Sequence, residues 1–141
     1  MTYLLDTDLF TLAHLGRPGP AARIAAARTA GVVGVSIVTQ IEVLRGRFDA
    51  VVKAADGAAI IRALDRLRSS EAFLAGFLVL PFDAAAVAAF DRLRIDKSAR
   101  KAGRNDLLIA CVALAHAATL VTRNAKDFAH VPGLRLENGA A

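Results

Sequence analysis

The stretch Thr2-Tyr-Leu-Leu-Asp6 is a short apolar run that stops at an acid, as a buried β-strand does. Three further runs with strand character lie at residues 31–36, 77–80 and 119–122, and residues 134–136 form a candidate short fifth strand. Segments with apolar residues at helical spacing separate these runs. The alternation of strands with helices predicts a parallel sheet with helices on both of its faces, which is an α/β fold.

Breaker and capping residues set the expected helix boundaries. A helix of about two turns should follow Asp6, and further helices are expected over residues 21–30, 39–48, 57–74, 84–100 and 106–117. Thr39, Asp83 and Asn105 fit the N-cap positions of three of these helices. Glu42 stands three residues after Thr39, so the two residues also match a capping box.

The composition bounds the class of protein. The chain has 141 residues, which suits one domain spanning residues 1–141. Hydrophobic residues make up 55% and charged residues 22%, so disorder is excluded as the main state. The longest uncharged run falls short of the roughly 20 apolar residues that span a bilayer, and the lone Cys111 excludes an internal disulfide framework. We therefore expect a cytoplasmic protein with no membrane partner.

The charge balance favours an anionic partner. The formal net charge is +5, and arginine supplies most of the basic residues. Arginine binds phosphate oxygens through two parallel hydrogen bonds, so nucleic acid or an acidic protein is the expected kind of partner. Six basic residues fall within a short stretch before Asp106, namely Arg92, Arg94, Lys97, Arg100, Lys101 and Arg104. This stretch is either a solvated helix face or a track for an RNA backbone that leads to Asp106.

Four acids and an amide are expected at one edge of the sheet. Asp6 ends the first strand, Glu42 follows the second strand, and Asn124 and Asp127 follow the fourth strand. Asp106 begins the helix that runs back before the fourth strand, so it starts at the same edge. Loops at the carboxyl ends of parallel strands share that edge.

Each acid also has a purely structural interpretation. Asp6 could cap the first helix, Glu42 could complete the capping box, Asp106 could offset the helix dipole, and Asp127 could be a turn residue. Their joint placement favours a metal site, because clustered like charges repel one another unless a cation lies among them. Oxygen ligands without paired histidine or cysteine suit Mg²⁺ or Mn²⁺, which would assist the cleavage of phosphodiesters.

Four motifs carry a resemblance to a known family. Leu4-Leu-Asp6-Thr7, the run from Ser36 to Gly46, Asn105-Asp106-Leu-Leu-Ile-Ala110 and the run from Leu120 to Phe128 resemble, in order, the motifs of PIN domains. More narrowly, they are similar to VapC-type toxins of toxin–antitoxin pairs. The resemblance implies a three-layer α/β/α sandwich with a small parallel sheet. It also implies a Mg²⁺- or Mn²⁺-dependent endoribonuclease, an antitoxin partner, an RNA substrate and a homodimer.

The family's site residues are carried over by position. Asp6 and Asp106 match the direct metal ligands, and Glu42 matches the third acid, which holds the metal through water or helps to activate it. The fourth acidic position of the wider family falls on Asn124, and Asp127 could supply the missing charge. Asp8 also departs from the family pattern, because asparagine or serine is more usual there.

Two other functions are compatible with parts of the sequence. Leu4-Leu-Asp6-Thr-Asp8 resembles the nucleophile motif of haloacid-dehalogenase-type phosphatases, although Phe10 stands where that motif has threonine or valine. A catalytically weak PIN-like module that binds RNA or protein would account for Asn124.

For the antitoxin, the expected docking surface is a groove between the first helices and the helix near Thr39. It is lined by Leu9, Leu12, Val43 and Leu44.

Overall fold

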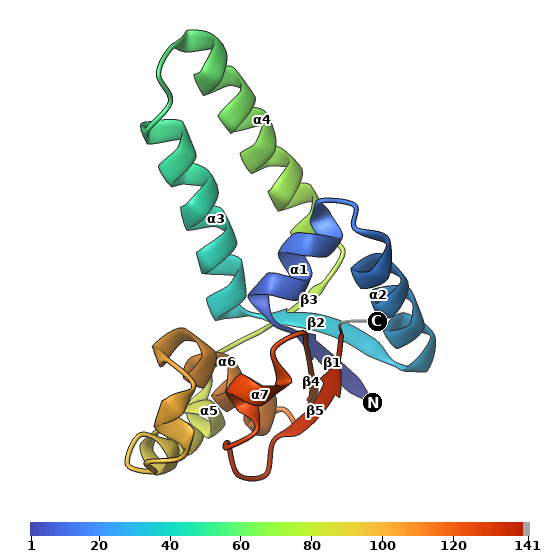
Figure 1. The fold of residues 1–141 in the computed structure, drawn as a ribbon, viewed down its shortest axis with the longest axis vertical. Coiled ribbons are helices and arrows are strands. Elements are labelled where there is room, and N and C mark those ends of the chain that lie inside the picture. The colour runs from blue at the N-terminus through green and yellow to red at the C-terminus, as the bar shows by residue number, and fades with distance from the viewer. Residues whose placement is uncertain (140–141) are drawn as a thin grey trace.

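The computed structural model describes residues 1–139, and its centre is a sheet of five parallel strands (Figure 1). The strands are β1 (Thr2–Leu5), β2 (Val32–Ser36), β3 (Leu78–Leu80), β4 (Thr119–Thr122) and β5 (Arg135–Asn138). Their order across the sheet is β3-β2-β1-β4-β5, and every neighbouring pair is parallel. The predicted α/β fold is therefore confirmed, including the short fifth strand.

The helices occupy the connections between the strands. They are α1 (Thr7–His14), α2 (Pro18–Ala30), α3 (Ile37–Val52), α4 (Gly57–Leu74), α5 (Ala84–Leu93), α6 (Arg104–Ala115) and α7 (Ala125–Phe128), with a 3₁₀ turn at Ala99–Lys101. α2 begins three residues earlier than expected, because proline at the first helical position has a φ angle that suits a helix start. Within residues 1–139, none of these helices has the length and apolar character needed to cross a membrane.

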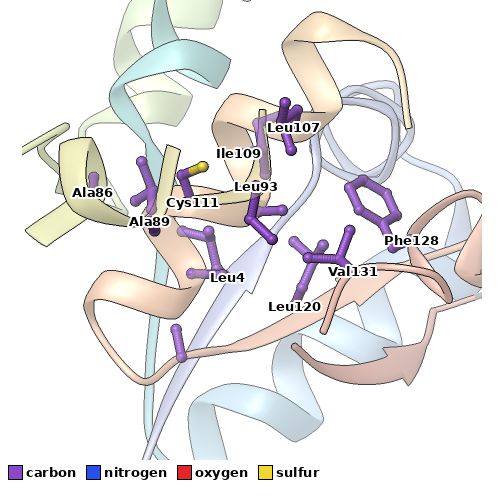
Figure 2. Close-up of a cluster of buried hydrophobic side chains, with 14 of the residues drawn as sticks. Leu4, Ala86, Ala89, Leu93, Leu107, Ile109, Cys111, Leu120, Phe128 and Val131 are labelled. Carbon is purple, nitrogen blue, oxygen red and sulfur yellow. The ribbon is translucent and has the colours of Figure 1, made fainter. Parts of the chain in front are cut away.

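Side chains that alternate along the strands build two cores, one on each face of the sheet. Leu4 and Leu120 face the layer formed by α5, α6 and α7, and Figure 2 shows them packed with residues of these helices. Leu5 and Val121 face the opposite layer, which contains α1, α2 and the end of α4. The period of two residues along each strand thus separates two apolar layers. The three-layer sandwich is confirmed.

The helical hairpin α3–α4 projects away from the sheet (Figure 1). α3 begins at the carboxyl edge of the sheet, directly after β2, and α4 returns the chain to β3. Several large apolar side chains on the hairpin are exposed, among them Phe48 (57%), Val52 (69%) and Ile61 (63%).

Two of the expected N-caps are wrong. The hydroxyl of Ser36, rather than that of Thr39, caps α3 by accepting the N–H of Thr39 at 3.0 Å, so the helix starts about one turn earlier than expected, at Ile37. Gly103, which has no side chain, occupies the N-cap position of α6. Asn105 lies inside the helix, and its side chain donates to Glu42 instead. The third expected cap is confirmed, since Asp83 accepts the N–H of Ala86 at 3.0 Å.

The expected length of α5 is also wrong. The helix ends at Leu93 instead of continuing to the basic residues near position 100. Asp96 accepts the N–H groups of Ser98 and Ala99 at 2.8 Å and 3.2 Å, and this local turn offers the backbone an alternative to the helix. The basic stretch is therefore not one helix: Arg92 lies in α5, Arg104 begins α6, and the four basic residues between them lie in a connection that contains the 3₁₀ turn.

Candidate active site

The predicted site lies where the order of the strands changes direction. β1 is central, with β2 and β3 on one side and β4 and β5 on the other, so the chain winds outward from β1 in both directions. In open parallel sheets such a point leaves a crevice at the carboxyl ends of the strands. Asp6 follows β1, and Asn124 follows β4, so both lie at this crevice.

Asp6 is buried and holds two structural hydrogen bonds. Its side chain is 5% exposed. Oδ1 accepts the N–H of Leu9 at 2.8 Å, which caps α1, and Oδ2 accepts the hydroxyl of Thr122 at 2.5 Å. Burial raises the pKa of Asp6 above its ordinary value, although both hydrogen bonds oppose the increase. The capping role is thus confirmed, and each oxygen accepts one side-chain or backbone hydrogen bond within residues 1–139, which leaves acceptor capacity for a ligand.

Asp106 lies half-buried in the first turn of α6, among other carboxylates. Burial raises its pKa most strongly, and the negative charges of Asp6, Asp127 and Glu42 raise it further. Like charges affect a pKa in this way only at short range. The structure therefore brings together the four acids that the sequence placed at this edge.

Glu42 is held by two hydrogen bonds from different helices. Oε1 accepts the hydroxyl of Thr7 in α1 at 2.8 Å, and Oε2 accepts Nδ2 of Asn105 in α6 at 3.0 Å. The expected capping box is not formed, because the hydroxyl of Thr39 instead lies 2.9 Å from that of Thr7. Glu42 in α3 thus joins three helices at the crevice, and its carboxylate is fixed in one orientation.

Asn124 and Asp127 lie on the exposed side of the crevice. Asn124 occupies the N-cap position of α7, where its side chain makes no capping bond, and its N–H donates to the hydroxyl of Thr122 at 3.0 Å. Asp127 lies in the first turn of α7, and its N–H donates to the carbonyl of Asn124 at 2.9 Å. Asp8 is exposed in the first turn of α1, where its charge raises the pKa of Asp6.

Three polar residues at the site were not identified as site residues from the sequence. Thr122 joins Asp6 to the loop after β4, and Thr7 and Asn105 hold Glu42. A signal for Thr122 exists, because it is a polar residue at the carboxyl end of a strand next to the strand that precedes Asp6. Thr7 and Asn105 carry no comparable signal, because only the tertiary fold brings them next to Glu42.

The chemistry of the donors fits a divalent ion that keeps several waters. Within residues 1–139, no three side chains of His, Cys, Asp or Glu are placed to hold a metal ion together. Mg²⁺ commonly binds one or two carboxylates and fills its other positions with water and substrate phosphate. Asp6 and Asp106 offer such a pair: burial is the main cause of the raised pKa of each, and the charge of Asp6 adds to the rise at Asp106, so a cation at the crevice would favour the charged form of Asp106.

Only three of the four apolar residues expected to line the docking groove are accessible at the surface. Leu9 is fully buried in the core, so its assignment to this surface is wrong, whereas Leu12, Val43 and Leu44 are half-buried. Val43 lines a cavity of about 340 Å³ between α1 and α3, together with Thr7, Thr11, Glu42, Gly46 and Arg47. The remaining groove therefore opens beside the carboxylates.

A comparison with known families decides the assignment. The PIN domain family matches residues 3–134, which include all four acids. The chain belongs to the PIN-domain family. This membership excludes the haloacid-dehalogenase-type phosphatase suggested by residues 4–8.

Similar PIN-domain proteins come from toxin–antitoxin complexes. The chain is 41% identical over 68 residues to Ribonuclease VapC2 of Rickettsia felis, a match that spans 47% of this chain and 51% of that protein. It resembles a chain of VapBC2 from Rickettsia felis bound to a promoter DNA fragment, with 30% identity, a TM-score of 0.74 and 98% coverage of both chains. DNA-bound VapBC from Salmonella typhimurium gives 25% identity, a TM-score of 0.76 and 99% coverage of both chains.

Proposed function

We propose that this PIN domain is a VapC-type endoribonuclease toxin that uses Mg²⁺ or Mn²⁺ and is controlled by an antitoxin. The observation that carries the proposal is the group formed by Asp6, Glu42 and Asp106 at the crevice of a PIN-domain chain. The name and the assemblies of the similar proteins support it. We also propose that residues 1–141 act as one domain.

The three acids have separate roles in the proposed reaction. Asp6 and Asp106 would hold the divalent ion, which when bound neutralises the phosphate and promotes ionisation of a water. Glu42, oriented by Thr7 and Asn105, would accept the proton of the water that attacks phosphorus. The bond from phosphorus to the 3′ oxygen breaks, and that oxygen leaves as a hydroxyl. Asn124 and Asp127 would complete the polar rim that receives the substrate.

The expected products carry 5′-phosphate and 3′-hydroxyl ends. Use of the ribose 2′-hydroxyl as nucleophile would call for an acid–base pair such as two histidines. His14 contacts Ser70, and His116 contacts Asp83 and the carbonyl of Pro81, so neither is bonded to Asp6, Glu42 or Asp106, and His130 alone does not make a pair. A water nucleophile is therefore favoured.

The test compares the purified chain with Asp6→Asn on RNA in Mg²⁺, in Mn²⁺ and in EDTA. Cleavage should need a divalent ion and should fall by about 10²–10³-fold or more in the variant, as for other losses of transition-state stabilisation. Asp49→Asn on the exposed side of α3 is a matched control that should retain activity. Full activity in EDTA, or products ending in 2′,3′-cyclic phosphate, would refute the mechanism.

The proposed partners are an antitoxin and a second copy of this chain. The net charge of +5 suits an antitoxin segment that is acidic or amphipathic. Half-buried Val43 offers such a segment an apolar contact beside Glu42, and Leu12 and Leu44 are half-buried on the same two helices. Co-expression with a small adjacent gene product should give a stable complex without nuclease activity. Normal growth of cells that express this chain alone, with no complex formed, would refute this part of the proposal.

A further inference from the structure

A cavity of about 650 Å³ opens between α5 and the N-terminus of α6, away from the carboxylates themselves. Its volume falls in the range of about 300–1,000 Å³ that is usual for ligand pockets. Three arginines and three apolar side chains contribute to its lining, namely Arg94, Arg100, Arg104, Phe90, Ile95 and Leu107. A cavity with cationic and apolar walls suits a ligand that has both a phosphate and a flat apolar surface.

Two of the three arginines have no acidic partner in the part of the chain that the structure describes. Within residues 1–139, no carboxylate lies within 4.0 Å of the guanidinium of Arg100 or of Arg104. Arg94 contacts Asp91 at 3.5 Å, but both side chains are more than half exposed, so this pair is weak. The cavity therefore carries positive charge that is free to bind an anion.

Arg104 and Phe90 form a cation–π pair at the wall of this cavity. The guanidinium carbon of Arg104 lies 5.0 Å from the centroid of the Phe90 ring. Phe90 is half-buried against the core on this face of the sheet, so its ring is fixed and holds the guanidinium on one side. Arg104 also lines the cavity, so its guanidinium is available to a ligand there. Unpaired bases of RNA stack on arginine planes of this kind.

The cavity and the carboxylates share one turn of helix. Arg104 and Leu107 line the cavity, and Asp106 lies between them in the first turn of α6. Asp106 projects from another side of the same turn, so a strand whose phosphate reaches Asp106 passes close to the turn that lines the cavity. Ile95, which is 73% exposed, adds apolar surface at the mouth of the cavity.

We infer that this cavity binds one unpaired nucleotide of the RNA strand next to the cleavage site. The base stacks on Arg104, which is supported from behind by Phe90, and Arg100 contacts the phosphate. The inference rests on the proposed ribonuclease function and adds to it a requirement for single-stranded RNA at this position.

The test measures binding of fluorescein-labelled single-stranded RNA of about ten nucleotides by fluorescence anisotropy in EDTA. Arg104→Ala and Arg104→Lys should both weaken binding by about 5- to 100-fold, because lysine keeps the charge and lacks the plane. Arg100→Ala should reduce the slope of log K against log salt by about 0.7, the value for one phosphate contact in a single strand. Arg66→Ala on exposed α4 is the matched control and should leave affinity and slope unchanged.

A second set of RNAs, each lacking one base, identifies the nucleotide. One such RNA should bind the unchanged chain as weakly as intact RNA binds Arg104→Ala, and the two changes together should cause no further loss. If Arg104→Lys binds RNA like the unchanged chain, the stacking role is refuted. If Arg104→Ala binds RNA normally but loses the partner protein, the cavity is a protein-binding site and the inference is wrong.

Cleavage measured separately distinguishes this inference from the function on which it rests. If RNA binding depends on Arg104 but no RNA is cleaved in Mg²⁺ or Mn²⁺, nucleotide binding in the cavity is supported and the proposed ribonuclease activity is refuted. If cleavage requires Asp6 and neither cleavage nor RNA binding changes on substitution of Arg104, nucleotide binding in the cavity is refuted and the proposed ribonuclease activity stands.

Discussion

Thr122→Val is the substitution that tests most directly how Asp6 is held. Thr122 is fully buried at the end of β4. Its hydroxyl donates to Oδ2 of Asp6 at 2.5 Å and accepts the N–H of Asn124 at 3.0 Å. Valine keeps the shape of the side chain but lacks the hydroxyl, so both partners lose a hydrogen bond at once.

The expected effect follows from the two bonds. A hydrogen bond to a charged group contributes about 1.5–3 kcal/mol, and one between neutral groups about 0.5–1.5 kcal/mol. We expect the free energy of unfolding at pH 7 to fall by about 2–4 kcal/mol, because the Asp6 end of the contact is buried. The loss should shrink as the pH is lowered. The bond to Thr122 lowers the pKa of Asp6, so its removal raises that pKa further, and protonation then stabilises the variant more than the unchanged protein.

Urea unfolding of the metal-free chain, at pH 7 and at successively lower pH, provides the measurement. Thr119→Val is the matched control, because Thr119 lies in the same strand, is 4% exposed and has no side-chain hydrogen bond within residues 1–139. It should change the free energy of unfolding by less than about 0.5 kcal/mol. Equal losses for the two variants, or a loss for Thr122→Val that does not vary with pH, would refute the reasoning.

Four further results are expected. Asp106→Asn should raise the free energy of unfolding at pH 7 in EDTA by roughly 0.5–1 kcal/mol, because repulsion among half-exposed carboxylates is relieved; unfolding in urea checks this, and a decrease would contradict it. Asn105→Ala should leave Glu42 held by one bond only and lower kcat by about tenfold with KM little changed, as steady-state kinetics would show. Burial lowers the pKa of His14 below 6.5, so the unfolded chain binds the proton more readily and stability should fall as pH drops through 6.5; His14→Gln should flatten this dependence in urea titrations. Asp127→Ala should reduce cleavage if Asp127 replaces a missing acid, and full activity in the nuclease assay would show that it does not.

The strands and helices could be predicted from the sequence because the patterns that indicate them lie within a few neighbouring residues. Short apolar runs such as Thr2–Leu5 and Thr119–Thr122 are buried strands, as their composition predicts. Helix ends were less predictable, because several polar residues compete for the same N–H groups. Ser36 and Thr39 both qualify as a cap, and only the backbone geometry selects Ser36. The early end of α5 depends in the same way on the turn formed by Asp96.

The convergence of the acids was predictable, while the groups that hold them were not. Parallel topology alone brings the carboxyl ends of β1 and β4 to one edge, together with Asp6 and the loop after Thr122. The partners of the acids depend on details of packing: Thr122 is 116 residues from Asp6, and Asn105 is 63 residues from Glu42. No spacing rule links residues so far apart.

The cap that Asp6 provides to α1 bears on why an acid stands at this position. Asparagine caps helices about as well as aspartate, and its amide could donate to the hydroxyl of Thr122 while its oxygen still accepts from Leu9. The helix cap therefore needs a polar side chain at position 6 and does not itself require a charge. The charge also opposes folding, since burial raises the pKa of this carboxyl. An amide would serve the cap and avoid the cost of burying a charge, so a carboxylate in such a buried place is consistent with a role of the charge toward a ligand.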